Sequence, residues 1–342
     1  MRSEPKTVAI IGAGSWGTAL AQHLGSKGIS IRLWVFEPEL LASLQDRHEN
    51  LVFLPGVKLS RHITFTDDLG EAVTDQHNVI MAVPSHVYRQ VLTSLAPHLS
   101  PGVTLVSATK GIETDSLLTM EGLVREVLGP ETAYAVLSGP SFAVEVANRQ
   151  PTAVTVASRS RPVATRIQRL FSSPYLRVYS SYDVTGVELG GALKNVMALG
   201  AGILEGLELG ANPRAALITR GLAEISRLAV RLGANPMTLA GLAGLGDLVL
   251  SCTSRLSRNY QVGLQLGQGK KLAEILKDMQ MVAEGLKTAG AAYHLARKLG
   301  VEMPIVEQMY RILYEDHSPQ DAIKRLMTRE LKDEIDAISL TW

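Results

Sequence analysis

The chain has 342 residues, which predicts two domains, because one domain usually takes about 100–200 residues. Hydrophobic residues make up 46% and charged residues 20%, an ordinary globular composition that excludes a disordered chain. The formal net charge is +1, from 34 basic and 33 acidic side chains, so the sequence lacks the basic excess of a nucleic-acid-binding protein and favours a small ligand.

The N-terminal part alternates β-branched segments with amphipathic ones, which is the pattern of a mostly parallel sheet with flanking helices. Thr7–Ile11 predicts a buried strand, Ser15–Lys27 a helix and Ile29–Val35 a second strand. Pro38 suits the first turn of the next helix, where an N–H is not needed. Further predicted strands are Ile63–Thr66, Asn78–Val83, Val103–Ser107, Ala133–Ser138, Ala153–Ala157 and Arg177–Ser180.

From Val184 onward the sequence has helical periodicity almost without strand signals. Gly-Ala-Asn-Pro at 210–213 and again at 233–236 predicts helix ends, and a glycine-rich segment covers Gly241–Gly246. Pro319–Asp336 predicts a charged, solvent-exposed amphipathic helix. We therefore expect an α/β domain over residues 1–186 and an all-α domain over residues 187–342.

The most apolar long segment, Val187–Leu209, predicts a buried helix of a soluble domain. A membrane span needs about 20 residues nearly free of charge, and this segment contains Glu188, Lys194, Asn195, Glu205 and Glu208. No hydrophobic region of a signal peptide follows the N-terminus, and we expect a cytoplasmic protein without integral membrane association.

The single cysteine, Cys252, excludes an intramolecular disulfide and suits a reducing compartment. Its apolar neighbours favour a small core residue over a reactive thiol. The eight histidines are scattered without metal-ligand spacing, so no metal site is predicted.

A glycine loop, Gly12-Ala13-Gly14-Ser15-Trp16-Gly17, lies between the first predicted strand and helix. Gly12 permits a tight turn, Gly14 lets a pyrophosphate approach the backbone, and Gly17 lets helix pack on strand. The helix N-terminus adds free N–H groups for the phosphates. This context predicts a Rossmann-like, dinucleotide-binding domain; the alternative is a structural turn without a ligand.

Glu37 follows the second predicted strand, twenty residues after Gly17. An acidic residue there accepts hydrogen bonds from the ribose hydroxyls of NAD and repels the 2′-phosphate of NADP. Glu37 therefore favours NAD; the alternative is that it caps the helix beginning at Pro38.

Lys194 has small or apolar helical neighbours, among them Gly190, Gly191, Met197 and Ala198. A lysine on such a face is not a solvated surface residue, and partial desolvation makes its amine easier to deprotonate. We interpret Lys194 as an acid/base residue, with Asp247 as the partner that would keep it charged. The alternative is a lysine that bridges to a carboxylate for structural reasons.

The tripeptide Ser257-Arg258-Asn259 follows a glycine-rich turn. An arginine with hydroxyl and amide neighbours suits a phosphate dianion, which a guanidinium binds with two parallel hydrogen bonds. Taken alone, the tripeptide could equally be a surface turn.

Six segments in this order resemble the bacterial NAD(P)-dependent glycerol-3-phosphate dehydrogenase family along nearly the whole chain. They are GAGSWGTALA, SATKGIE, LSGPSFA, ELGGALKNVMALGAGI, GLAGLGDLVLSCTS with SRN, and VAEGLKTA. The resemblance implies an oxidoreductase that reversibly reduces dihydroxyacetone phosphate to sn-glycerol 3-phosphate with NADH or NADPH. It also implies a homodimer whose product supplies glycerophospholipid synthesis.

The resemblance also implies roles for individual residues. Lys194 is expected to exchange a proton with the C2 oxygen of the substrate, with Lys110 and Asp247 as the other catalytic residues. The expected substrate contacts are Lys110, Gly139, Ser141, Lys194, Asp247, Ser257, Arg258 and Asn259, and Ser251 is expected near the site. Together with the glycine loop, the expected cofactor contacts are Gly12, Gly14, Ser15, Trp16, Gly17, Phe36, Glu37, Lys110, Ala143, Arg258, Val282 and Glu284.

Two departures from the family pattern affect these expectations. Relatives often have Arg or His after the second strand, where it can meet a 2′-phosphate, whereas this chain has Phe36-Glu37. Relatives often continue SRN with a basic residue, whereas this chain has Tyr260. The alternatives are another two-domain dehydrogenase, of hydroxy acids or hydroxyacyl thioesters, and a non-catalytic nucleotide sensor.

Overall fold

The structure is a computed structural model that describes residues 7–277, 279 and 283–334. Over these residues the eight predicted strands are confirmed, with ends that differ by two residues at most. The strands are β1 (Thr7–Ile11), β2 (Ser30–Trp34), β3 (Ile63–Thr66), β4 (Asn78–Met81), β5 (Thr104–Ser107), β6 (Ala133–Ser138), β7 (Thr152–Ala157) and β8 (Leu176–Ser181).

One sheet contains all of these strands in the order β3-β2-β1-β4-β5-β6-β7-β8. Neighbouring strands from β3 to β6 pair in parallel, and β7 pairs with β6 in the antiparallel direction. The carboxyl ends of β1, β4, β5 and β6 therefore share one edge of the sheet, and ligands of such sheets bind at this edge. The predicted mostly parallel, Rossmann-like sheet is confirmed.

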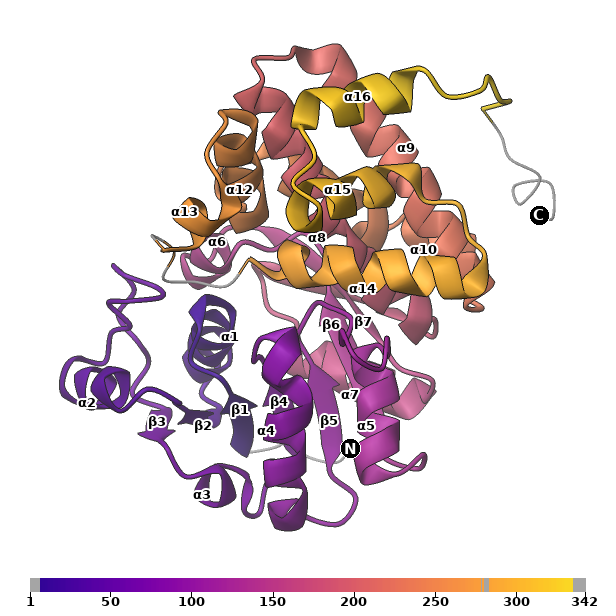
Figure 1. Ribbon diagram of the computed structural model, residues 1–342. Helices are drawn as coiled ribbons and strands as arrows, with labels where there is room; N and C mark the ends of the chain where they lie inside the picture. The colour runs from indigo at the N-terminus through magenta and orange to yellow at the C-terminus, as the bar shows by residue number, and fades with distance from the viewer. Residues whose placement is uncertain (1–6, 278, 280–282, 335–342) are drawn as a thin grey trace.

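Helices cover both faces of the sheet (Figure 1). Helices α1 (Ser15–Ser26), α2 (Pro38–Arg47), α6 (Ala143–Ala147) and α7 (Arg161–Phe171) contribute to the core on one face. On the other face lie α3 (Leu69–Val73), α4 (Tyr88–Leu95) and α5 (Met120–Leu128), with short helices η1 (Ser85–Val87) and η2 (Ala96–His98) beside α4. The first two turns of α8 (Val184–Gly206) join this second core through Val184 and Val187.

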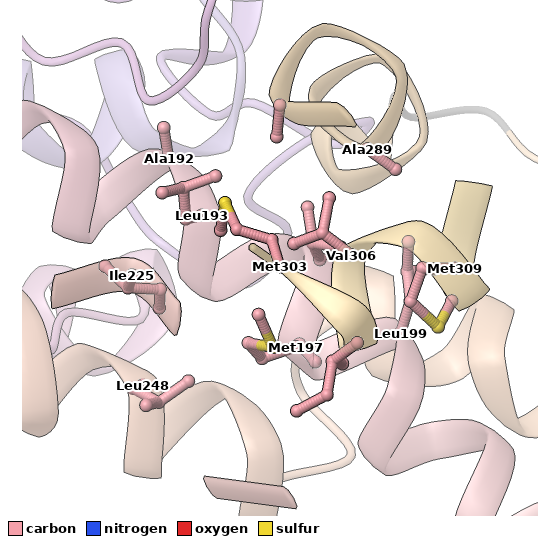
Figure 2. Close-up of a cluster of buried hydrophobic side chains, with 14 of the residues drawn as sticks. Ala192, Leu193, Met197, Leu199, Ile225, Leu248, Ala289, Met303, Val306 and Met309 are labelled. Carbon is pink, nitrogen blue, oxygen red and sulfur yellow. The ribbon is translucent and has the colours of Figure 1, made fainter. Parts of the chain in front are cut away.

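Among the described residues from 184 to 334 every regular element is a helix, as the sequence predicted. After α8 come α9 (Ala211–Arg231), α10 (Pro236–Leu239), the π-helical η3 (Leu242–Gly246), α11 (Asp247–Thr253), α12 (Arg258–Gly267), α13 (Leu272–Lys277), α14 (Glu284–Leu299), α15 (Pro304–Tyr314) and α16 (Pro319–Met327). Figure 2 shows side chains of α8, such as Leu193 and Met197, among those of the surrounding helices. Helix α8 is thus the centre of the helical core.

Close packing of α12 against α8 depends on glycine. A Cβ on Gly202 would lie 2.0 Å from the carbonyl oxygen of Tyr260, and one on Gly263 would lie 2.0 Å from that of Leu199. By length and composition, α8 and residues Pro236–Thr253 could each cross a membrane, but 94% of the apolar window of α8 is buried inside the protein. The prediction of a buried core helix is confirmed.

Two predictions about helix ends are wrong. The last helix ends at Met327, and the residues beyond it leave the helical path, with Arg329 and Lys332 ion-paired to Glu302; the predicted end, Asp336, lies outside the described residues. The first Gly-Ala-Asn-Pro begins a helix, with Pro213 in the first turns of α9, whereas the second separates α9 from α10. The domain division at residue 186 falls in the first turn of α8 and stays a prediction.

Candidate active site

The glycine loop connects β1 to α1 at the carboxyl edge of the sheet. Gly12 has a φ of +111°, and a Cβ there would lie 2.8 Å from the carbonyl oxygen of Ala82. A Cβ on Gly17 would lie 1.9 Å from the carbonyl oxygen of Gly12, whereas one on Gly14, at the start of α1, would meet no atom within 4 Å. The loop is closed against the protein at Gly12 and Gly17 and open at Gly14, which fits a cradle for a dinucleotide pyrophosphate.

The end of β2 presents two exposed side chains. The Phe36 side chain is 72% exposed, and its ring lies 5.9 Å from that of Trp34. Glu37 occupies the N-cap position of α2, with Pro38 in the first turn as predicted, but the Glu37 carboxylate makes no capping hydrogen bond. The Glu37 side chain therefore does not cap α2, which contradicts the alternative interpretation, and its carboxylate is exposed to solvent.

Other predicted cofactor contacts lie beside the loop. Trp16 follows Ser15 on the first turn of α1, and its buried Nε1 has no hydrogen-bond partner among the described residues. Ala143 begins α6, which packs against α1. Val282 lies outside the described residues.

Two lysines from different elements bind one buried carboxylate. Lys194 Nζ on α8 donates to Asp247 Oδ1 at 2.6 Å, and Lys110 Nζ, beyond β5, donates to Asp247 Oδ2 at 2.5 Å. The Asp247 side chain is 1% exposed and that of Lys194 is 11% exposed. Lys194 Nζ also donates to Ser251 Oγ at 2.8 Å, so Ser251 lies at the site as expected.

Glycines on α8 create this arrangement. A Cβ on Gly190 would lie 2.6 Å from the carbonyl oxygen of Ala243 in η3, the segment that leads directly into Asp247. A Cβ on Gly191 would lie 2.5 Å from Ser138 Oγ and 3.5 Å from the side chain of Lys110. Helix α8 therefore touches η3 and the sheet edge one turn before Lys194, and this contact brings both partners to Asp247.

The protein environment of Lys194 makes its ammonium group easier to deprotonate than that of a lysine in water. Burial lowers the pKa of Lys194 to about 8, against the carboxylate of Asp247, which raises it, while Lys110 lowers it further. The desolvation and the opposing effect of Asp247 both agree with what the sequence predicted. An amine with a pKa of about 8 can both give and take a proton near neutral pH.

Lys110 also donates to the carbonyl oxygen of Gly139 at 3.1 Å, and Ser141 Oγ donates to the same oxygen at 3.0 Å. Gly139 has a φ of +133°, and a Cβ there would lie 3.0 Å from Val154 Cα, so a side chain would not fit. The segment after β6 thus meets the lysine pair through backbone and hydroxyl groups.

The tripeptide Ser257-Arg258-Asn259 forms the start of α12, which excludes a simple surface turn. Ser257 Oγ caps the helix by accepting from the amide of Tyr260 at 3.3 Å. Asn259 Nδ2 donates to Asn195 Oδ1 at 3.0 Å, and Asn259 Oδ1 accepts from the amide of Gly285 at 2.9 Å. Asn259 therefore ties α12 to α8 beside Lys194 and to the start of α14.

Arg258 is exposed to solvent, yet desolvation lowers the pKa of its guanidinium, against the carboxylate of Glu284, which raises it. Neighbouring protein atoms therefore remove part of the hydration of this guanidinium although solvent reaches the residue. Tyr260, the expected departure from the family pattern, is buried and donates its hydroxyl hydrogen to Glu205. The position is therefore part of the core of the helical domain.

Glu284 has a partner that the sequence analysis missed. Its Oε1 accepts from the amide of Ser85 at 2.9 Å, and its Oε2 accepts from the Ser85 hydroxyl. Ser85 begins η1, directly beyond β4, so these bonds join α14 to the sheet edge across the two domains. The position of Ser85 after a strand end was the available signal; nothing in the sequence pairs it with Glu284.

The remaining polar candidates are of a different kind. No group of three or more His, Cys, Asp or Glu side chains that could hold a metal ion occurs among the described residues. Cys252 is buried, and burial raises the pKa of its thiol to about 12, which suits an unreactive core residue.

Comparisons with known proteins agree along both domains. The family described as NAD-dependent glycerol-3-phosphate dehydrogenase N-terminus matches residues 7–164, and its C-terminal counterpart matches residues 183–324. The chain is 56% identical over 329 residues to a protein of Citrifermentans bemidjiense named glycerol-3-phosphate dehydrogenase [NAD(P)+], covering 96% of this chain and 98% of that one. A protein of Geobacter metallireducens with the same name is also 56% identical, with the same coverage. The crystal structure of glycerol-3-phosphate dehydrogenase from Coxiella burnetii is similar with a TM-score of 0.93 at 39% identity, covering 96% of this chain and 100% of that one.

Proposed function

The chain belongs to the NAD-dependent glycerol-3-phosphate dehydrogenase family, and on that premise we propose that it reversibly reduces dihydroxyacetone phosphate to sn-glycerol 3-phosphate. The observation that carries this proposal is the convergence of Lys110 and Lys194 on Asp247. Two ammonium groups and one carboxylate give the site a net positive charge, which suits a phosphorylated ketone. A family match over both domains counts against a dehydrogenase of another class and against a nucleotide sensor.

A nicotinamide dinucleotide fits the loop between β1 and α1, where a side chain on Gly14 would meet only open space. Gly12, Gly14 and Gly17 would hold the pyrophosphate, with Ser15, Trp16 and Ala143 beside it, and Arg258 and Glu284 would contact the cofactor from the helical domain. When bound, the cofactor supplies or accepts the hydride. The other steps fall to side chains of this chain.

Lys194 is the proposed acid and base. In the reducing direction its ammonium gives a proton to the C2 oxygen of dihydroxyacetone phosphate, and in the oxidising direction its amine takes that proton back. Asp247 and Ser251 each bind Nζ and hold it in one orientation. Lys110 stabilises negative charge on the substrate and would contact the cofactor.

The phosphate of the substrate is proposed to bind at the start of α12. Arg258 would hold it with two charge-assisted hydrogen bonds, and the helix N-terminus adds its positive end. Gly139, Ser141, Ser257 and Asn259 complete the proposed substrate contacts. Asn259 acts partly through its bonds to Asn195 and Gly285, which fix α12 beside Lys194.

The exposed carboxylate of Glu37 at the end of β2 supports a preference for NAD. A ribose hydroxyl can donate to this carboxylate, whereas the 2′-phosphate of NADP would be repelled by it. Phe36 brings no positive charge to compensate. We propose NADH as the better reductant, with NADPH as the weaker one.

The wider setting is proposed from the family resemblance. The protein would act as a cytoplasmic homodimer, without a nucleic-acid or integral membrane partner, and its product would enter glycerophospholipid synthesis. Its first 186 residues would form the dinucleotide-binding domain and residues 187–342 the substrate domain. Light scattering of the purified protein measures the oligomeric state directly.

The test of the proposed reaction is nicotinamide absorbance in the presence of dihydroxyacetone phosphate. We expect rapid oxidation of NADH and a lower kcat/KM with NADPH. A lack of turnover with both reductants would contradict the proposed reaction. Faster turnover with NADPH would contradict only the role of Glu37.

A further inference from the structure

Glu188 is a buried carboxylate that the proposed mechanism does not use. It lies on the second turn of α8 and is 5% exposed. Its Oε1 accepts from the backbone amide of Glu121 at 2.9 Å and from the hydroxyl of Tyr134. Glu121 belongs to α5 and Tyr134 to β6, so both partners lie in the sheet domain.

These bonds make Glu188 the cap of another helix. Thr119 occupies the N-cap position of α5 without a capping side-chain hydrogen bond. Instead, the Glu188 carboxylate accepts a hydrogen bond from the backbone amide of Glu121 in the first turn of α5. The N-terminus of a helix also stabilises a nearby negative charge. Helix α8 is therefore fastened to the N-terminus of α5.

The lysine pair lies a short distance along the same helix. Gly191, three residues after Glu188, touches Ser138 and the side chain of Lys110, and Lys194 is three residues further. Because α8 is continuous from Val184 to Gly206, a hydrogen bond that fixes its second turn also fixes its rotation against β5 and β6. A small rotation at this level would move Lys194 away from Asp247.

We propose that Glu188 is a positioning residue for the lysine pair: by capping α5, it holds α8 on the sheet so that Lys194 and Lys110 reach one carboxylate. The consequence for turnover rests on the proposed function, whereas the capping contact itself does not. A misplacement of reacting groups by about 1 Å can cost about a hundredfold in rate.

Glu188 is also expected to change charge in the neutral range. Burial raises the pKa of Glu188 to about 7, against hydrogen bonds from the Thr119 and Tyr134 hydroxyls, which lower it, while the carboxylate of Glu121 raises it further. The titratable and charged groups that face it are Glu121 and its partner Arg125 on α5, Tyr134 on β6, Tyr88 on α4 and Arg159 beyond β7. Ionisation changes the strength of the hydrogen bond that the Glu121 amide donates, so this amide reports the charge of Glu188.

Glu224 offers a matched control. It is 1% exposed and accepts from the amides of Ile305 and Val306, at 2.7 and 3.2 Å, at the start of α15. Burial raises its pKa to about 7 as well. Glu224 and α15 both belong to the helical domain, so this cap has the same chemistry without joining α8 to the sheet.

The first experiment is a pH titration of the ¹⁵N-labelled full-length protein, followed at the Glu121 amide. We expect its proton shift to move with a midpoint near pH 7 in the wild type and to stay constant in Glu188→Gln. An identical Glu121 amide shift in the wild type and in Glu188→Gln at every pH would overturn the capping contact. Because this titration needs no substrate, its result tests the contact between Glu188 and the Glu121 amide independently of the proposed reaction.

The second experiment compares the steady-state kinetics of Glu188→Ala, Glu188→Gln and Glu224→Ala with dihydroxyacetone phosphate. Glu188→Ala is expected to lower kcat about tenfold with a smaller change in KM. Glu188→Gln, whose amide oxygen can accept both hydrogen bonds, should restore most of that loss, and Glu224→Ala should keep the wild-type kcat. Equal kcat values for Glu188→Ala and Glu224→Ala would overturn the positioning role.

Discussion

Lys110 and Lys194 are 84 residues apart in the sequence and bind opposite oxygens of the same buried carboxylate, Asp247. Removing one partner of such a cluster leaves the others without charge compensation in a buried site. A substitution of any one of the three residues therefore changes the electrostatic environment of the other two. Its effect on proton transfer and its effect on ligand binding should be measured separately.

Replacement of Lys194 by alanine should lower kcat at least about a hundredfold, because the substrate oxygen loses its proton donor. Binding of NADH, followed by quenching of protein fluorescence, should remain near the wild-type value, because the proposed cofactor contacts lie at other positions. Turnover near that of the wild type would remove Lys194 from the acid/base role. A loss of NADH binding would instead indicate a structural effect of the substitution.

Asp247→Asn should shift the pH dependence of turnover. The carboxylate raises the pKa of Lys194, so its removal should lower that pKa from about 8. Reduction of dihydroxyacetone phosphate needs the ammonium form and should therefore decline at a lower pH than in the wild type. Oxidation of glycerol 3-phosphate needs the amine and should begin to rise at a lower pH. If the decline of reduction and the rise of oxidation stay at the same pH as in the wild type, or move to higher pH, this account of the ion pair is contradicted.

Arg258→Ala should raise KM for dihydroxyacetone phosphate by an amount worth about 2–3 kcal/mol, because a charge-assisted contact of a partly desolvated guanidinium is lost. Arg258→Lys keeps the charge but loses the two parallel hydrogen bonds of the guanidinium. Its KM should lie between those of the wild type and Arg258→Ala. The measurement is initial rate against substrate concentration at saturating NADH. An unchanged KM in the alanine variant would place the phosphate elsewhere.

The fold was largely predictable because its signals are local. The eight strands are short runs of apolar, often β-branched residues such as Thr7–Ile11, and each is paired inside the sheet. At the last helix the periodic pattern continues beyond Met327, whereas in the structure Arg329 and Lys332 leave the helix and bind Glu302, which is distant in sequence. Ion pairs between segments that are distant in sequence leave no periodic signal.

The site was predictable where a residue was unusual in its surroundings. Lys194 stood out among glycines and apolar residues, and its partner Asp247 precedes Ser251 by one helical turn, so both reach the same amine. Glu188 is also a charge in an apolar segment, and Ser85 also follows a strand end, but neither position indicates its partner. The packing of the two domains brings Glu121 to Glu188 and Glu284 to Ser85. Hydrogen bonds between domains require the tertiary structure to be known.

Glu224→Gln should change how stability depends on pH. Burial raises the pKa of Glu224 from its ordinary value near 4.5 to about 7, so between these values the folded protein binds the proton more tightly than the unfolded chain does. The contribution of this group is fully present below about pH 4.5 and is lost as pH rises through 7, by up to about 3 kcal/mol. Glutamine cannot ionise and escapes this loss, although the hydrogen bonds to Ile305 and Val306 change by an amount that does not depend on pH.

The measurement is the free energy of unfolding from urea denaturation at pH 5 and pH 8. The value for the variant minus that for the wild type should be larger at pH 8 than at pH 5. Glu188 titrates equally in both proteins and cancels in the difference, and parallel pH curves for the wild type and the variant would show that Glu224 keeps an ordinary pKa.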